Sequence, residues 1–488
     1  MTQRLFNTLT NQKEELVPRE GRKIGMYVCG PTVYDMSHVG HARCYSAFDT
    51  VARWLRTSGY DVTFVRNYTD VDDKIIKRAN ELGVPPHEIS ERYIREFQTD
   101  MAALNVLPAD VEPKVTGHMP EIISLIERLV EKGFAYESEG DVYFAVKVFE
   151  PYGKLSKRNL DDLLAGARVE VGERKRDPLD FALWKTAKPG EPAWDSPWGK
   201  GRPGWHIECS AMSEKYLGPS FDIHGGGKDL VFPHHENEIA QSEADSGLNL
   251  AAYWMHNGFV TINAEKMAKS LGNFTTIRDM LARYDGEALR FFLLGTHYRS
   301  PIDFSVEAID AAQARVAYVY ETLAKVDERL SRPGADVSPE GPVHNAEIVD
   351  TLWSRFAEAM EDDFNTAAAL GVISEAFPLM NEYVDRPPVK DKALVARTLL
   401  RMRDTVLRVG DVFGVWRQEP KAWLKVHRER MAAQRGIEPS WVEERIGARA
   451  DARKAKDFAA ADAIRDELQA RGVEIMDSPG GTTWRVIA

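Results

Sequence analysis

Within the first seventy residues, two short apolar runs flank a stretch whose apolar positions recur at helical spacing. This pattern predicts the order strand, helix, strand. Ile24 to Val28 is a short apolar run that predicts a buried strand, and Asp61 to Val65 predicts the next one. Ser37 is the expected N-cap of the intervening helix, and Gly59 is the expected C-cap. Apolar positions recur at helical spacing between these caps: Tyr45, Phe48, Val51, Ala52 and Leu55. A strand–helix–strand unit of about forty residues predicts a parallel sheet.

The first strand is followed by a segment from Tyr27 to Arg43 that reads YVCGPTVYDMSHVGHAR and leads into this helix. In parallel sheets, ligands bind beyond the carboxyl ends of the strands, against a helix N-terminus. The helix dipole and the imidazoles of His38 and His41 would favour a polyphosphate there. Gly40 would let a flat base approach the backbone. The alternative is a surface helix start with two ordinary histidines.

The remaining pattern splits the α/β region and places helices after it. Phe134 to Val146 predicts a hairpin, and the polar, mixed-charge stretch that follows it is typical of a surface insertion. Phe221 to His224 and Tyr253 to Val260 predict further strands, and Ser305 to Leu330 predicts one long helix. We therefore expect a Rossmann-like α/β fold with a parallel sheet and a small insertion, followed by an α-helical C-terminal region. The expected divisions are 1–115 with 179–304 for the α/β domain, 116–178 for the insertion, and 305–400 and 401–488 for the helical parts.

Composition narrows the class of protein. A chain of 488 residues suggests three or four domains, and 43% hydrophobic with 28% charged residues is typical of a soluble globular protein. No apolar run approaches the roughly 18 residues of a membrane-spanning helix, and the N-terminus lacks a signal-peptide core. Three cysteines cannot form a disulfide framework, so a reduced, cytoplasmic compartment is expected. The net charge of −12 disfavours a general nucleic-acid coat but permits a local RNA site.

Cys29, Cys209, His234 and Glu238 are the candidate metal ligands. His234 and Glu238 are four residues apart and would share one helix face. Thiolate, imidazole and carboxylate together suit zinc. The long gaps between these residues form no spacing motif, and the alternatives are buried cysteines acting as small hydrophobes and a solvated His/Glu pair. Cys44 lies inside the first helix, where a packing role is the better interpretation.

A polar loop, EKMAKSLGN from Glu265 to Asn273, follows the last predicted strand. Its two lysines, Lys266 and Lys269, are point charges suited to phosphate. A loop that closes over a leaving group would stabilise the charge that builds up in a phosphoryl-centred transition state. A solvated pair of lysines is the alternative for this loop.

Taken together, these motifs resemble a known family. HVGH resembles the HIGH signature of class I aminoacyl-tRNA synthetases, and KMAKS resembles their KMSKS loop. More narrowly, the chain resembles the cysteinyl-tRNA synthetases in YVCGPTVYD, NYTDVDDKII, GRPGWHIECSAM, GGGKDLVFPHHENEIAQSEA, HNGF, KDFAAADAIRDEL and DSPGGTTWR. The resemblance runs nearly end to end. Its departures are Val39 in place of Ile and Ala268 in place of Ser, and both lysines and both histidines remain.

The resemblance implies a two-step reaction. Cysteine and ATP would give cysteinyl-adenylate and pyrophosphate, and the cysteinyl group would then pass to the terminal adenosine of tRNA(Cys). His38 and His41 would stabilise the triphosphate, while Lys266 and Lys269 would neutralise the leaving pyrophosphate. The expected cofactors are one Zn²⁺ and the Mg²⁺ that accompanies ATP. The expected partners are L-cysteine, ATP and tRNA(Cys), with a monomeric chain and no membrane.

The resemblance also implies how cysteine is selected. Gly30, Thr32, Trp205 and His224 would line the amino-acid pocket, and Asp229, in a Gly-x-Asp sequence, would contact the ribose. A pocket that reads shape alone separates cysteine from serine poorly, by about 1–3 kcal/mol, whereas zinc would select the thiolate and remove the need for editing. Because four protein ligands would close the zinc site, one must loosen or a fifth must add, and Glu238 is the candidate to loosen.

RNA recognition is expected in the helical part, with the stem contacted after residue 305 and the anticodon read by the last hundred residues. Four tryptophans would be able to stack unpaired bases or belong to the core: Trp416, Trp423, Trp441 and Trp484. Two other functions remain open. One is a ligase that joins cysteine to a sugar amine, as in mycothiol synthesis, which has no need of an anticodon-reading tail. The other is a non-catalytic zinc or redox sensor, which has no need of HVGH and KMAKS together.

Overall fold

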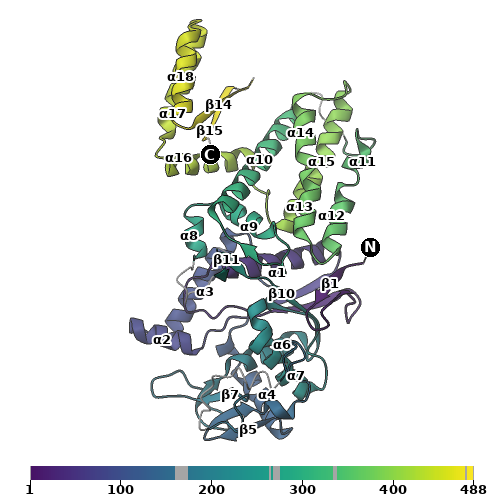
Figure 1. The fold of residues 1–488 in the computed structure, drawn as a ribbon, viewed down its shortest axis with the longest axis vertical. Coiled ribbons are helices and arrows are strands. Elements are labelled where there is room, and N and C mark those ends of the chain that lie inside the picture. The colour runs from purple at the N-terminus through teal and green to yellow at the C-terminus, as the bar shows by residue number, and fades with distance from the viewer. Residues whose placement is uncertain are drawn as a thin grey trace.

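The structure is a computed structural model that describes residues 2–159, 174–262, 265–266, 275–332, 338–478 and 481–486. Figure 1 shows a small antiparallel sheet at one end of the molecule, the parallel sheet in the middle and a helical region at the other end. The unit that contains α17 and α18 projects beside that helical region. In the described part of the chain, no helix is both long enough and apolar enough to cross a membrane.

The central sheet is parallel, with the strand order β10-β9-β3-β4. Its strands are β3 (Lys23–Val28), β4 (Asp61–Arg66), β9 (Phe221–Gly227) and β10 (Ala251–Asn257). Helix α1 (Val39–Thr57) connects β3 to β4, so the predicted strand–helix–strand unit and the α/β class are confirmed. The N-cap is His38 rather than the predicted Ser37, which places an imidazole at the helix start itself.

An antiparallel sheet with the order β5-β6-β7-β8 is inserted between β4 and β9. Its strands are β5 (Ala135–Ser138), β6 (Asp141–Phe144), β7 (Phe181–Thr186) and β8 (Gly201–Pro203). The predicted hairpin is confirmed, and Gly140 occupies its turn with φ of 83°. Strands β7 and β8 lie beyond residue 178, where the sequence placed the end of the insertion. The antiparallel unit reaches Pro203 because Phe181, Ala182 and Trp184 pair with β6, and β8 then pairs with β7.

Helices precede and follow these strands within the α/β part. They are α2 (Asp73–Leu82), α3 (Pro86–Ala103), α4 (Met119–Glu131), α6 (Trp205–Leu217) and α7 (Glu236–Ser246), with short turns η1 (Val115–Gly117), η2 (Val146–Val148), η3 (Lys228–Leu230) and η4 (Val231–His235). Two small sheets complete this part: β1 (Arg4–Asn7) with β2 (Gln12–Glu15), and β11 (Val260–Ile262) between β12 (Glu265–Lys266) and β13 (Ile302–Asp303).

The C-terminal region is helical up to Ala470. Its helices are α8 (Ile277–Leu281), α9 (Gly286–Leu294), α10 (Val306–Leu330), α11 (Ala346–Val349), α12 (Leu352–Glu361), α13 (Thr366–Ser374), α14 (Ala376–Asp385), α15 (Lys392–Phe413), α16 (Pro420–Gln434), α17 (Pro439–Lys454) and α18 (Phe458–Ala470). The predicted long helix is confirmed as α10, capped by Ser305. The division expected after residue 400 falls inside α15, so it does not coincide with a break in the structure. Strands β14 (Val473–Ser478) and β15 (Gly481–Val486) form a terminal hairpin.

Three hydrophobic cores are found among the described residues, and they hold these parts of the fold together. The largest joins one face of the parallel sheet to the helical region, through residues such as Phe48 on α1 and Phe356 on α12. A second core joins the sheet to the inserted unit and contains both Cys29 and Cys209. A small third core, which includes Trp484, belongs to the C-terminal unit. The two cysteines therefore lie at the junction between the parallel sheet and the insertion.

Candidate active site and metal centre

Four elements converge on a buried cluster of metal-binding side chains. Cys29 directly follows β3, Cys209 lies on α6, His234 lies in η4 and Glu238 lies in the first turn of α7. None of the four is more than 4% exposed. The Sγ atoms of Cys29 and Cys209 are 3.7 Å apart, and Glu238 Oε1 lies 3.3 Å from Cys29 Sγ. His234 Nε2 lies 3.1 Å from the same carboxylate oxygen. The structure thus brings together all four residues that the sequence predicts as metal ligands.

The spacing of these atoms suits zinc. Bonds of about 2.3 Å to sulfur and 2.0–2.2 Å to nitrogen and oxygen place tetrahedral ligand atoms about 3.3–3.8 Å apart. The observed separations of 3.1, 3.3 and 3.7 Å are close to this range. One donor atom from each residue lies within 4.8 Å of every other. Thiolate, imidazole and carboxylate therefore already surround a space of the size that one ion needs.

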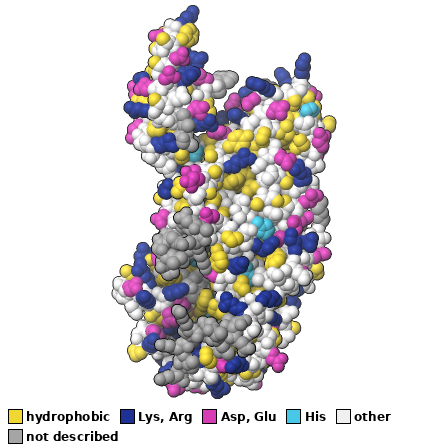
Figure 2. All heavy atoms as spheres, viewed as in Figure 1, with side chains coloured by type: hydrophobic (Ala, Val, Ile, Leu, Met, Phe, Trp, Pro, Cys, Tyr) yellow, Lys and Arg dark blue, Asp and Glu magenta, His cyan; other side chains and the backbone are white. Residues whose placement is uncertain are grey.

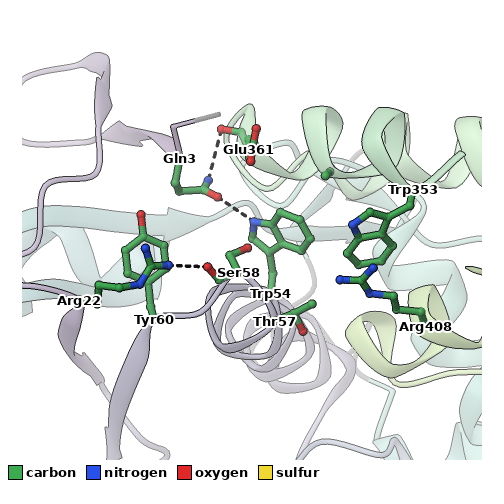
Figure 3. Close-up of a pocket in the computed structure, with 10 residues that line it drawn as sticks. Gln3, Arg22, Trp54, Thr57, Ser58, Tyr60, Trp353, Glu361 and Arg408 are labelled. Carbon is green, nitrogen blue, oxygen red and sulfur yellow. Dashed lines mark hydrogen bonds between the residues drawn. The ribbon is translucent and has the colours of Figure 1, made fainter. Parts of the chain in front are cut away.

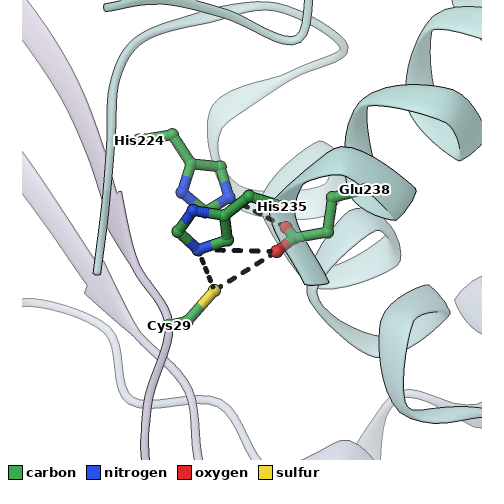
Figure 4. Close-up of side chains that lie close together, drawn as sticks. All are labelled: Cys29, His224, His235 and Glu238. Carbon is green, nitrogen blue, oxygen red and sulfur yellow. Dashed lines mark hydrogen bonds and ion pairs between the residues drawn. The ribbon is translucent and has the colours of Figure 1, made fainter. Parts of the chain in front are cut away.

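Two further histidines extend the cluster into a second possible donor set, formed by Cys29, His224, His235 and Glu238 (Figure 4). His224 Nε2 lies 2.8 Å from Glu238 Oε2, and His235 Nε2 lies 3.3 Å from Cys29 Sγ. His235 Nδ1 is also within hydrogen-bond distance of His256 Nε2, at 2.8 Å. The sequence analysis assigned His224 to the amino-acid pocket and missed His235, although the doublet at 234–235 was a possible signal.

The electrostatics favour the set that contains both thiols. A hydrogen bond from the Cys29 thiol is the main reason why the pKa of Cys209 falls to about 6. Burial and the neighbouring Cys209 raise the pKa of Cys29. Burial alone would raise the pKa of Glu238, but His224 and His234 outweigh it and hold this pKa well below its usual range. At neutral pH the metal-free pocket thus holds a Cys209 thiolate and a Glu238 carboxylate beside a protonated His234, and the two negative charges attract a cation.

The expected amino-acid residues border this cluster. The Gly30 N–H donates to Asn67 Oδ1 at 2.8 Å, and a Cβ on Gly30 would lie 1.5 Å from the Asn67 carbonyl oxygen, so only glycine fits. Thr32 pairs through its backbone with Thr69. The Trp205 ring stacks on His234 with centroids 4.3 Å apart and remains 38% exposed. Asn67, which the sequence analysis missed, also lies 3.7 Å from Cys209 Sγ.

The HVGH segment lies at the start of α1, at the same edge of the sheet. The rings of His38 and His41 stack with centroids 3.8 Å apart, and the His38 N–H donates to His41 Nδ1 at 3.2 Å. A Cβ on Gly40 would lie 2.7 Å from His38 Cε1, so the glycine also makes room for that ring. The Tyr45 hydroxyl, two turns along the same helix, donates to the Cys29 carbonyl at 3.3 Å. Helix α1 therefore joins the histidine motif to the metal-donor cluster.

The residues that follow the lysine loop pair with this motif. Lys266 lies in β12, whereas Lys269 is outside the described residues. Beyond the loop, the backbone of 275–277 pairs with the histidine segment: the Val39 N–H donates to Thr275 O at 3.2 Å, and the Ile277 N–H donates to Ser37 O at 2.9 Å. Asp229 lies in η3, directly after β9. The chain thus leaves the loop beside the start of α1.

The tryptophans belong mainly to the core. Trp416, Trp423 and Trp484 are each at most 3% exposed, which rules out stacking on RNA bases in this conformation. Trp423 stacks on Tyr320 inside the protein, with ring centroids 4.4 Å apart. Trp441 is half-buried, with the Arg471 guanidinium 4.4 Å from its ring centroid. The packing interpretation therefore holds for three of the four.

Comparison with known proteins agrees with these features. Residues 15–314 match the family described as tRNA synthetases class I (C) catalytic domain, residues 355–417 match a DALR domain, and residues 441–485 match a cysteinyl-tRNA ligase anticodon binding domain. The cysteine–tRNA ligase of Geobacter metallireducens is 56% identical over 488 residues, and that of Anaeromyxobacter dehalogenans is 58% identical over 492 residues. Both alignments cover 100% of each chain.

A solved structure shows the same fold. Methionyl-tRNA synthetase from Mycobacterium tuberculosis, in complex with methionyl-adenylate, matches 81% of this chain and 92% of its own length, with a TM-score of 0.61 and 18% identity. At that identity the match bears on the fold alone, whereas the full-length relatives and the domain matches establish the family. The chain therefore belongs to the cysteine–tRNA ligases, a family of class I aminoacyl-tRNA synthetase enzymes.

Proposed function

We propose that this chain attaches cysteine to tRNA(Cys) in two steps. The cysteine carboxylate attacks the α-phosphate of ATP, which gives cysteinyl-adenylate and releases pyrophosphate. A hydroxyl of the terminal adenosine of the tRNA then attacks the acyl carbon, and AMP leaves. The observation that carries this proposal is that a pocket for a thiol and a helix start suited to phosphate lie at one sheet edge, joined by the bond between Tyr45 and Cys29.

Zinc is the proposed ion of the donor cluster, held by Cys29, Cys209, His234 and Glu238. Bound there, it would supply a soft Lewis acid that prefers the thiolate of cysteine to the hydroxyl of serine, a pair that shape alone separates by only about 1–3 kcal/mol. Glu238 is the proposed ligand that loosens when cysteine binds. Its Oε2 is already held by His224 at 2.8 Å, so the carboxylate keeps a partner when Oε1 withdraws.

The remaining motif residues are proposed to bind ATP and the leaving pyrophosphate. His38 and His41, at the positive end of α1, stabilise the triphosphate. Lys266 and Lys269 neutralise the pyrophosphate as it leaves, and Mg²⁺ accompanies the ATP. Asp229 contacts the ribose. The nearness of 275–277 to the start of α1 supports a loop that acts on the same phosphates.

Gly30, Thr32, Trp205 and His224 are proposed to form the amino-acid pocket. Gly30 donates to Asn67, which lies beside Cys209, and the Trp205 ring stacks on His234 and is 38% exposed. His224 holds the Glu238 carboxylate, so it influences the pocket through Glu238. The thiol of cysteine would thus enter between Trp205 and the donor cluster.

The helical part is the proposed tRNA-binding region. Residues 305–400 would contact the stem and 401–488 the anticodon, which is consistent with the domain matches at 355–417 and 441–485. Figure 2 shows basic and acidic side chains interspersed on one face, rather than one large basic area. RNA contacts would therefore be local. We also propose a monomeric chain and a cytoplasmic location.

Two assays in sequence test the function. Cysteine-dependent exchange of pyrophosphate into ATP reports adenylate formation, and charging of tRNA(Cys) reports transfer, with serine as the matched control substrate. Both activities are expected, with strong preference for cysteine. Exchange without charging would favour the ligase that uses a sugar amine as acceptor. Zinc binding without exchange would favour the sensor.

A further inference from the structure

A cavity of about 280 Å³ lies where the end of α1 meets α12 and α15 (Figure 3). Its walls come from two parts of the chain. Arg22, Trp54 and Tyr60 belong to the α/β part, whereas Trp353 and Arg408 belong to the helical part. Three aromatic rings and two guanidinium groups thus face one space at the junction between these parts.

This cavity is separate from the reaction centre. Arg22 directly precedes β3 and Tyr60 directly precedes β4, so the cavity lies at the amino-terminal edge of the parallel sheet. His38 and Cys29 lie at the carboxyl-terminal edge. The 19 residues of α1 separate the two places by about 28 Å at 1.5 Å per residue. A ligand in this cavity would not touch the substrates.

Arg408 is the less tightly held of the two arginines in this cavity, because Arg22 donates to two backbone carbonyls. Its guanidinium carbon lies 3.3 Å from the Trp353 ring centroid. Within the described residues, no carboxylate pairs with it and no acceptor is hydrogen-bonded to it, and burial lowers its pKa with no acidic neighbour to oppose this. Two other arginines of α15 are paired: Arg401 with Asp350 and Arg403 with Asp327, at 2.6 and 2.5 Å.

The rest of the lining is held in place. Arg22 donates to the carbonyls of Ser58 and Gly59, both at 2.6 Å, and lies over the Tyr60 ring. The Trp54 indole N–H donates to Gln3 Oε1 at 2.7 Å. Ser58 Oγ, in contrast, is buried without a hydrogen-bond partner in the described part of the chain. The cavity therefore offers one unpaired guanidinium and one unpaired hydroxyl on an otherwise satisfied frame.

We propose that this cavity binds a small planar organic anion, a flat ring that carries one carboxylate or one phosphate. The ring would lie against the aromatic walls, and the anionic group would reach Arg408. The volume lies just below the range of about 300–1,000 Å³ that is typical of ligand pockets, which favours a small ligand over a nucleoside triphosphate. Glu361, on the opposite side, disfavours a second negative group and favours a ring N–H donor.

Binding to the full-length chain tests this site. Two probes, AMP and indole-3-acetate, are titrated by calorimetry while a saturating non-hydrolysable ATP analogue occupies the nucleotide site. At least one probe should bind with a stoichiometry of one. Arg408→Gln should weaken that binding at least about tenfold, whereas the matched control Arg403→Gln, on the same helix, should not. Binding of AMP alone would identify a phosphate ligand, and binding of indole-3-acetate alone a carboxylate.

A second variant covers the case in which Arg408→Gln unfolds. Ala357→Leu keeps the arginine and adds three carbon atoms to the cavity wall, so it should weaken binding while the unfolding temperature and the pyrophosphate exchange stay unchanged. The proposal is overturned if neither probe binds at millimolar concentration, or if Arg408→Gln and Arg403→Gln weaken binding equally. It is also overturned if Ala357→Leu folds and binds as the unsubstituted chain does.

Discussion

The metal-donor cluster draws its residues from four elements that are distant in the chain, whereas the HVGH motif lies within one helix start. Cys29 reaches Cys209 only because β3 pairs with β9 and α6 packs behind them. His38 and His41 need only α1 to form. The metal-donor cluster is buried, and its side chains have shifted pKa values. The histidines of the HVGH motif are only partly buried.

The two regions are therefore preorganised in different ways: the cluster by tertiary packing, and the HVGH motif by one helix. The cluster exists only in the folded chain, so binding of a metal ion there would be coupled to folding. The histidine motif lies at a helix N-terminus, whose dipole is present once α1 has formed. We therefore expect changes in the cluster to remove the metal and cysteine recognition together. Changes in the motif should slow the reaction and leave the metal in place.

The largest effect is expected from Cys209→Ala. The variant should lose most of its zinc, and cysteine-dependent exchange should fall by more than the roughly 10–100-fold typical of a residue behind a ligand. Metal analysis and exchange assays with cysteine and serine measure this. Cys44→Ala is the matched control, because Cys44 is buried in α1 outside the cluster. Full zinc content with unchanged discrimination in the Cys209 variant would contradict the role of the cluster.

His41→Ala should lower the exchange rate about 100–1,000-fold, because one donor to the developing phosphate charge is lost. The zinc content should stay at one per chain, since His41 lies outside the donor cluster. The rate is measured against ATP concentration, and zinc is measured in the same preparation. Loss of zinc in this variant would show that the HVGH motif and the metal-donor cluster do not act independently.

Gly40→Ala isolates the packing beneath the motif. The new Cβ would lie 2.7 Å from the His38 ring and must displace it, so exchange should slow about tenfold while the fold persists. Gly371→Ala is the control, because a Cβ on Gly371, in α13, meets no atom within 4 Å. It should add about 0.5–1 kcal/mol of stability without changing activity. Equal activity of the two variants would rule out a positional role for His38.

The smallest effect concerns the pH dependence of stability. Burial would lower the pKa of His234, but Glu238 and Cys209 outweigh it and raise this pKa to about 10 in the metal-free chain. The folded pKa is above the unfolded value of about 6.5, so this stabilisation is fully present below pH 6.5 and is lost as pH rises through 10. Zinc requires deprotonated ligands, so added zinc should stabilise more as pH rises.

Urea midpoints from pH 6.5 to 10, with zinc and with a chelator, measure this difference. The lowered pKa of Cys209 opposes this loss up to about pH 8.5, where the unfolded thiol also ionises. The chelated chain should therefore lose stability mainly above about pH 8.5, and the zinc-loaded chain should lose less or gain. His234→Gln should flatten the slope of the chelated chain. If the urea midpoint changed with pH by the same amount with and without zinc, metal binding at the cluster would not release protons.

Much of the fold was predictable from local patterns. The apolar run at Ile24 to Val28 and the helical spacing that follows it gave the strand–helix–strand unit, and Gly140 marked the hairpin. The boundaries were less predictable. Residues 181–203 read as a return to the α/β domain, yet β7 and β8 join the inserted sheet, because strand partners are chosen by contacts that lie far apart in the chain.

The candidate site divides in the same way. The motifs indicated Cys29, Cys209, His234 and Glu238 once the family resemblance was considered, although their spacing alone did not. Nothing in the pattern placed His235 against Cys29. For Trp416, Trp423 and Trp484 the sequence favoured core positions over base stacking, and their burial in the structure agrees.

By itself, the sequence determined the chemistry available to this protein: two thiols, a histidine–glycine–histidine helix start and a loop with two lysines. Those features depend on residue type and short spacing, which the chain carries locally. The tertiary structure alone decided which donors meet, because the pairing of β3 with β9 brings Cys29 beside Cys209, His234 and Glu238. It also formed the cavity beside Arg408, since α1 must pack against α12 and α15 before that space exists.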